Sequence, residues 1–126
     1  MGKGKLTQNG VHLQDHEYVT VKFFLEQGID VELIPKSQIK DFRQPDIMMN
    51  GTAWEIKAPI GAGKKTIQNI LQNAAGQSRN VIVDLFRSKM DEDKAIIGYR
   101  NYFMESHRIK RLKIIKKNRE ILDFQK

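Results

Sequence analysis

The chain of 126 residues is 40% hydrophobic and 29% charged, a composition typical of one globular domain with a single core. It carries 22 lysines and arginines against 15 aspartates and glutamates, and the formal net charge of +7 favours a polyanionic partner such as nucleic acid. The sequence has no membrane-spanning run and no signal-peptide pattern, and the absence of cysteine excludes disulfides and thiolate metal sites.

Residues 1–13 are polar and contain several glycines, so we expect a flexible leader ahead of a folded domain that covers 14–126. A helix is predicted over 14–27, because Gly28 follows at a position where a left-handed residue can end it. The predicted apolar stripe of this helix comprises Tyr18, Val21, Phe24 and Leu25.

Glu17 lies on the same stripe, four residues before Val21. A carboxylate on a core-facing stripe costs free energy unless it has a partner, which makes Glu17 a candidate site residue. The alternative is structural, because a glutamate in the first turn is favoured by the helix dipole.

A β-hairpin is predicted around Asn50-Gly51, which lies between two apolar runs and favours a two-residue type I′ turn. This turn fixes the register, so that Asp46 lies opposite Glu55 and both project from the same face of the sheet as Lys57. Four apolar side chains project from the other face and are predicted to enter the core: Ile47, Met49, Trp54 and Ile56.

Two carboxylates that face each other across a hairpin repel and destabilise it. A divalent cation between Asp46 and Glu55 would remove this repulsion, with Lys57 beside it. Hard cations such as Mg²⁺ prefer carboxylate oxygens and need only one or two of them together with a substrate phosphate. The alternative is a hairpin salt bridge, such as Glu55 with Lys57, a kind of pair that is common on surfaces and individually weak.

The remaining apolar segments predict further strands and helices by their length and periodicity. These elements are strands over 29–34 and 81–86, helices over 65–76 and 91–107, and a final hairpin of 112–116 with 120–124. Asp84 interrupts the strand over 81–86, and we interpret it as a residue that caps the following loop. The predicted order is helix, three strands, helix, strand, helix and two strands.

Basic and amide side chains from loops and from the start of the second helix are candidates for contacts with nucleic-acid phosphates. These candidates are Lys36, Lys40, Arg43, Lys64, Lys65 and Gln68. For Lys64 and Lys65 the alternative is a solvated helix terminus. The histidines do not indicate a second centre, because His12 precedes the predicted helix that carries His16, and His107 lies beside a basic run.

Pro45-Asp46, followed after a short gap by Glu55-Ile56-Lys57, resembles the signature of the PD-(D/E)XK nuclease superfamily. The first six predicted elements are similar to the αβββαβ core of that superfamily. Gln-Pro-Asp-Ile-Met, Asn-Gly and Trp-Glu-Ile-Lys-Ala-Pro, all within 44–59, resemble one branch more closely. That branch is the tRNA-nuclease C-terminal toxin domains of contact-dependent growth inhibition.

The resemblance implies a single α/β domain of the α+β type, with helices around a mixed central sheet. The restriction-endonuclease-like αβββαβ core would be extended by a C-terminal helix and β-hairpin. The resemblance also implies that the protein is an endonuclease that depends on Mg²⁺ or Mn²⁺. Asp46 and Glu55 would bind the cation, Glu17 and the backbone carbonyl of Ile56 would be further ligands, and Lys57 would orient or activate the attacking water.

For the toxin branch, the resemblance implies tRNA as substrate, a cognate immunity protein, and action in the cytoplasm of the cell that receives the toxin. The resemblance also implies a helper glutamine or basic residue near the second helix, but it does not indicate which residue this is. Two alternatives stay open: a DNA endonuclease of restriction or repair type from a mobile element, and a non-catalytic nucleic-acid-binding module. The intact Asp46, Glu55 and Lys57 argue against the second.

Overall fold

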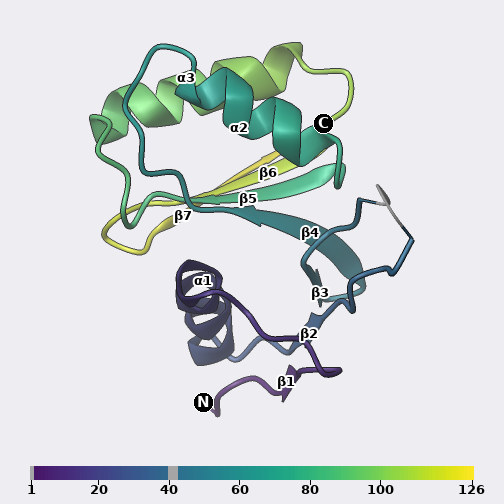
Figure 1. The fold of residues 1–126 in the computed structure, drawn as a ribbon. Coiled ribbons are helices and arrows are strands. Elements are labelled where there is room, and N and C mark those ends of the chain that lie inside the picture. The colour runs from purple at the N-terminus through teal and green to yellow at the C-terminus, as the bar shows by residue number, and fades with distance from the viewer. Residues whose placement is uncertain (1, 40–42) are drawn as a thin grey trace.

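The computed structural model describes residues 2–39 and 43–126, which form one α+β domain (Figure 1). Its strands lie in one mixed sheet in the order β1-β2-β3-β4-β5-β6-β7. The elements are β1 Leu6–Thr7, α1 Asp15–Glu26, β2 Val31–Leu33, β3 Ile47–Met49, β4 Thr52–Lys57, α2 Thr66–Ala75, β5 Asn80–Asp84, α3 Glu92–Glu105, β6 Arg111–Ile115 and β7 Ile121–Gln125. The predicted single domain with a mixed sheet flanked by helices is confirmed.

The run α1-β2-β3-β4-α2-β5 has the predicted order αβββαβ, and α3 with the β6–β7 hairpin follows it. Strands β2, β3 and β4 pair antiparallel, β4, β5 and β6 pair parallel, and β6 pairs antiparallel with β7. Helix α1 covers one face of the sheet, and α2 and α3 lie side by side over the other (Figure 1). In the described residues, no helix is long and apolar enough to cross a membrane.

The β3–β4 hairpin has the predicted register, with Ile47 opposite Trp54 and Met49 opposite Thr52. Asn50 and Gly51 have φ angles of +51° and +76°, as a type I′ turn requires. Residues at both turn positions must adopt a left-handed backbone, and asparagine and glycine do so at low cost. The turn therefore sets which face each side chain of the hairpin occupies.

Each face of the sheet has its own buried cluster. Ile47, Met49, Trp54 and Ile56 pack with Phe24 and other residues on the α1 face, which confirms the predicted apolar face of the hairpin. The larger cluster on the opposite face joins the sheet to α2 and α3. Because Glu55 and Lys57 alternate with the buried apolar residues of β4, they project to the α2 side of the sheet.

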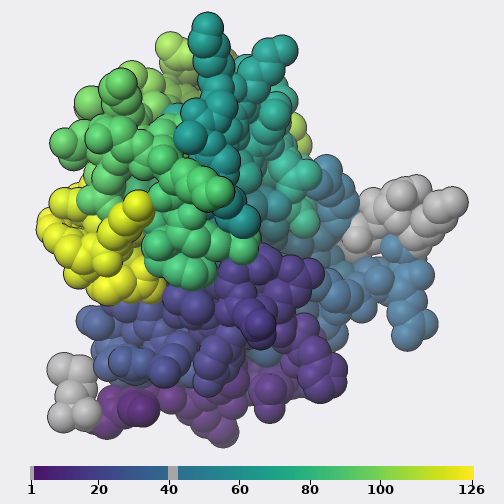
Figure 2. Space-filling view, turned by 60° about the vertical axis from the view of Figure 1, so that its left-hand side comes forward, coloured from purple at the N-terminus to yellow at the C-terminus, as the bar shows by residue number. Residues whose placement is uncertain are grey.

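Part of the segment 1–13, which was expected to be a leader, contributes a strand to the sheet. Leu6 and Thr7 form β1, which pairs in parallel with β2. The amide of Gly4 donates to the carbonyl of Leu25, and the amide of Lys5 donates to Asp30 Oδ1 at 2.8 Å. Figure 2 shows these purple N-terminal residues packed against the rest of the chain. A two-residue strand has no periodicity, so the sequence pattern could not indicate it.

The stripe predicted for α1 is wrong at one position. Tyr18 is 48% exposed, whereas Thr20 is fully buried. The Thr20 hydroxyl donates to Asp84 Oδ2 at 2.8 Å, and the Arg119 guanidinium donates to both Asp84 oxygens at 2.8 and 3.1 Å. Asp84 also accepts from the Phe86 amide, as expected for a residue that caps a loop. A polar network therefore connects α1, β5 and the β6–β7 turn.

Candidate functional site

A cavity of about 430 Å³ opens at the end of β4 between the N-terminus of α1 and the segments that follow α2 and β5. Six of the residues that the sequence singled out line it: Glu17, Lys36, Asp46, Glu55, Ile56 and Lys57. They come from α1, from the loop before β3, and from β4. The hairpin register brings the two carboxylates together, because Asp46 precedes Ile47 just as Glu55 follows Trp54.

Asp46 is 6% exposed and is held in place from two sides. The Ile56 amide donates to its Oδ2 at 2.8 Å, and the Lys36 ammonium donates to its Oδ1 at 3.1 Å. These two hydrogen bonds fix the orientation of the carboxylate at the cavity wall. The role of the Ile56 carbonyl as a metal ligand stays a prediction.

Glu55 is 2% exposed and only partly satisfied. Its Oε2 lies 3.3 Å from the Lys57 ammonium, whereas its Oε1 is buried and has no hydrogen-bond partner among residues 2–39 and 43–126. Burial, and then the charge of Asp46, raise the pKa of Glu55 to about 8, although Lys57 opposes this shift. A divalent cation between the two carboxylates would satisfy the orphaned oxygen, so the residues fit such an ion.

The raised pKa of Glu55 makes the stability of the metal-free chain depend on pH. Between about 4.5, the ordinary pKa, and about 8, the folded state retains a proton that the unfolded state has released. The free energy of unfolding is therefore expected to fall as the pH rises through this window. Urea denaturation in EDTA measures it, and Glu55→Gln should lack this decline. Parallel pH curves for the two proteins would contradict the burial of an ionisable Glu55.

Glu17 lines the cavity, and it also has a structural role. Its Oε1 accepts a hydrogen bond from the Gln14 amide at 3.0 Å, which caps the start of α1. In the described part of the chain, no three side chains of the His, Cys, Asp or Glu type lie close enough to hold a metal together. The structure therefore brings Asp46 and Glu55 together as a pair of possible ligands. Two carboxylate ligands suffice for Mg²⁺, because this ion keeps several waters.

The residues predicted to contact nucleic acid are spread over several places. Lys36 lines the cavity, and Lys40 lies outside the described residues. Arg43 lies against the end of α2, where a methyl group added to Gly76 would come within 2.8 Å of its Nη1. The other three, which do not line the cavity, are exposed at the start of α2: Lys64, Lys65 and Gln68.

The cavity is also lined by residues that the sequence did not assign to it, among them His12, His16, Gln77 and Arg87. The spacing of the two histidines was visible, but their position beside a carboxylate pair depends on how α1 packs on the sheet. Gln77 follows α2 and has a buried Oε1 without a partner in the described residues, so it is the glutamine near this helix that reaches the cavity. Arg87 is held by a 2.8 Å hydrogen bond to the Ala58 carbonyl.

The ammonium of Lys57 is fixed at the cavity wall. Besides Glu55 it contacts Asn73 of α2, whose Oδ1 accepts a hydrogen bond at 2.6 Å. Two buried carboxylates, an oriented ammonium and flanking cationic side chains can together hold a metal ion and a phosphate.

Comparisons with known proteins agree with this fold. A solved structure described as a CdiA-CT/CdiI toxin and immunity complex from Burkholderia pseudomallei contains a chain that is similar to this one, with a TM-score of 0.69. The similarity covers 98% of this chain and 100% of the other, at 18% sequence identity. At this identity the match establishes the fold. A search of curated proteins found no match.

A family model gives the more specific result. The model of the contact-dependent growth inhibition CdiA C-terminal domain matches residues 43–121, which include the hairpin, α2, β5, α3 and β6. This match extends over more than half of the sequence. The chain therefore belongs to the family of contact-dependent growth inhibition CdiA C-terminal domains.

Proposed function

We propose that this chain is a metal-dependent nuclease of the PD-(D/E)XK type that hydrolyses phosphodiester bonds. The observation that carries the proposal is the convergence of Asp46, Glu55 and Lys57 on one cavity, with one Glu55 oxygen unsatisfied. A salt bridge alone would explain Lys57 beside Glu55, but it would leave Glu55 Oε1 buried without a partner in the described residues.

When bound between Asp46 and Glu55, Mg²⁺ or Mn²⁺ would lower the pKa of a coordinated water and neutralise charge on the phosphate. The protein residues would supply the geometry. The Ile56 amide and Lys36 hold the Asp46 carboxylate in position. Lys57, held between Glu55 and Asn73, would position the attacking water or stabilise the charge that develops in the transition state.

The proposed substrate is tRNA, and the proposed role is that of a toxin domain. Family membership supports the toxin role, and the net charge of +7 supports a polyanionic substrate. We also propose a cognate immunity protein, because the structurally similar chain comes from a toxin and immunity complex. An immunity protein for so basic a chain should be acidic, since opposite charges accelerate capture.

The test offers total tRNA, plasmid DNA and single-stranded DNA side by side with Mg²⁺, to the wild type and to Glu55→Ala. We expect the wild type to cleave tRNA and neither of the two DNA substrates, and we expect Glu55→Ala to cleave none of the three. Expression of the wild-type chain by itself should arrest growth, and Glu55→Ala should relieve the arrest. Cleavage of plasmid instead would favour a DNA endonuclease, and binding to either nucleic acid without cleavage would favour a binding module.

A further inference from the structure

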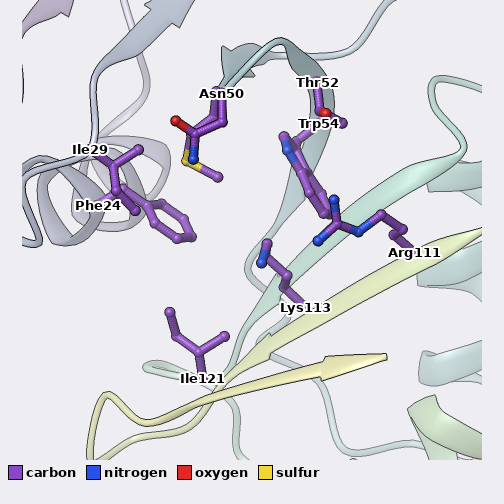
Figure 3. Close-up of a pocket in the computed structure, with 9 residues that line it drawn as sticks. Phe24, Ile29, Asn50, Thr52, Trp54, Arg111, Lys113 and Ile121 are labelled. Carbon is purple, nitrogen blue, oxygen red and sulfur yellow. The ribbon is translucent and has the colours of Figure 1, made fainter. Parts of the chain in front are cut away.

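A second cavity lies on the α1 face of the sheet, away from the carboxylate pair. It has a volume of about 140 Å³ and lies between the end of α1, the tip of the β3–β4 hairpin and the β6–β7 hairpin (Figure 3). Glu55 and Lys57 project to the α2 side of β4. Thr52 and Trp54, which line this second cavity, project to the α1 side of the same strand. It is therefore a separate site.

Two cationic side chains of β6 lie over the indole ring of Trp54 in this cavity. The guanidinium carbon of Arg111 lies 4.9 Å from the ring centroid, and the Lys113 ammonium lies 5.2 Å from it. Trp54 is 2% exposed, so it serves as a buried platform, whereas the Arg111 side chain is 30% exposed. The ring therefore holds the guanidinium at one wall of the cavity, where part of the Arg111 side chain is exposed.

Arg111 is only weakly paired within the protein. Its Nε is buried and has no partner within the described residues, and its Nη2 lies 3.4 Å from Asp123 Oδ2, which is long for a charged pair. Lys113 lies closer to the same carboxylate oxygen, at 2.5 Å. Asp123 thus mainly neutralises Lys113, and positive charge remains at Arg111.

The other walls of the cavity suit a flat, partly apolar group. Phe24, Ile29 and Ile121 form an apolar side, and the Asn50 amide and the Thr52 hydroxyl come from the hairpin turn (Figure 3). Apolar side chains combined with a few placed polar groups are typical of small-ligand sites. A space this small admits one such group and not the surface of a protein.

We propose that this cavity receives the base of a single unpaired nucleotide, which lies against Arg111, while the phosphate stays at the cavity mouth beside Arg111 and Lys113. Unpaired RNA bases stack on arginine planes and aromatic rings, and their phosphates pair with cations. Where the nucleotide belongs to an RNA substrate, the inference rests on the proposed function, and the pocket then anchors that RNA away from the bond that is cleaved. Binding of free nucleotides does not depend on cleavage.

Trp54 is the only tryptophan in the sequence, so its fluorescence reports on this cavity directly. The probes are adenosine 5′-monophosphate and cytidine 5′-monophosphate, compared with adenosine, inorganic phosphate and a hexaglutamate peptide at constant ionic strength. Saturable changes in emission with the nucleotides are expected, with adenosine and phosphate each binding at least tenfold more weakly. No saturable change, or equal binding of phosphate alone, would overturn the proposal. Preferential binding of the peptide would overturn it in favour of a protein partner.

Variants separate the stacking contact from simple charge. Arg111→Lys keeps the charge and removes the plane, so nucleotide affinity should fall about tenfold, the size of one stacking contact. Thr52→Val, which preserves the shape of the side chain, should weaken the binding of one or both nucleotides because the hydroxyl is lost. Lys117→Ala, which removes an exposed lysine in the β6–β7 turn, is the control and should change nothing. Unchanged affinity in both Arg111→Lys and Thr52→Val would contradict the placement of the nucleotide.

A kinetic comparison then links the pocket to the substrate. If tRNA is cleaved, Arg111→Lys should raise KM severalfold and leave kcat unchanged, because the pocket binds without touching the reacting phosphate. An equal fall in kcat would mean that Arg111 acts in the chemical step and would overturn the anchoring role. If no nucleic acid is cleaved while nucleotides still bind at Trp54, the proposed function fails and the nucleotide site stands.

Discussion

Lys57→Ala is expected to fold normally and to cleave roughly 10²–10³-fold more slowly than the wild type, the usual loss when one positioned electrostatic donor is removed. The ammonium lies 3.3 Å from Glu55 and 2.6 Å from Asn73, so its position depends on two elements of the fold. Substrate affinity should change much less than the rate, because Lys57 acts where charge develops during the reaction. Single-turnover cleavage of tRNA with saturating Mg²⁺ measures the effect.

The control for this prediction is Lys94→Ala, which removes one positive charge from an exposed position of α3. It should cleave at the wild-type rate, with at most a small change in affinity from the lower net charge. A Lys57→Ala protein with near-normal turnover would show that the lysine is only the salt-bridge partner of Glu55.

Arg119→Ala is expected to lower the free energy of unfolding by about 2–3 kcal/mol, because it removes the charged partner of a buried carboxylate. Asp84 is fully buried, and without Arg119 it retains only the Thr20 hydroxyl and the Phe86 amide. The loss should be at the lower end for buried pairs, since the Arg119 side chain is 30% exposed. Urea denaturation followed by circular dichroism measures the difference.

Two further variants make the Arg119 prediction specific. Arg100→Ala, at an exposed position of α3, should leave stability within about 0.5 kcal/mol of the wild type. Asp84→Asn combined with Arg119→Ala should recover part of the loss, because the unpaired buried charge is then gone. If the double variant is as unstable as Arg119→Ala, the cation–π contact of Arg119 with Phe23 would be the more important interaction.

The hairpin was predictable from sequence because its information is local. Asn50-Gly51 fixes a turn type, the turn fixes the register, and the register places Asp46, Glu55 and Lys57 on one face. The helices and longer strands were predictable for a similar reason, since each has an apolar period and recognisable ends. Element boundaries shifted by only a few residues, as helix and strand ends depend on individual hydrogen bonds.

What the sequence could not provide depends on tertiary packing. The strand β1 exists because its backbone pairs with β2, and the burial of Thr20 reflects a hydrogen bond to Asp84, which is 64 residues away. His12, His16 and Arg87 reach the cavity only because α1 and the end of β5 meet β4 there. The platform of Arg111 on Trp54 likewise joins residues from β6 and β4, two strands that are not neighbours in the sheet.

The most direct test of the central claim is a calorimetric titration of Mn²⁺ into the wild type, Asp46→Asn and Glu55→Gln. One saturable site is expected in the wild type, and binding at least tenfold weaker is expected in each variant, because each loses one of two carboxylate ligands. Asp93→Asn, which changes an exposed carboxylate in the first turn of α3, should bind as the wild type does. Equal binding by all four proteins, or cleavage of tRNA that proceeds fully in excess EDTA, would contradict a metal site between Asp46 and Glu55.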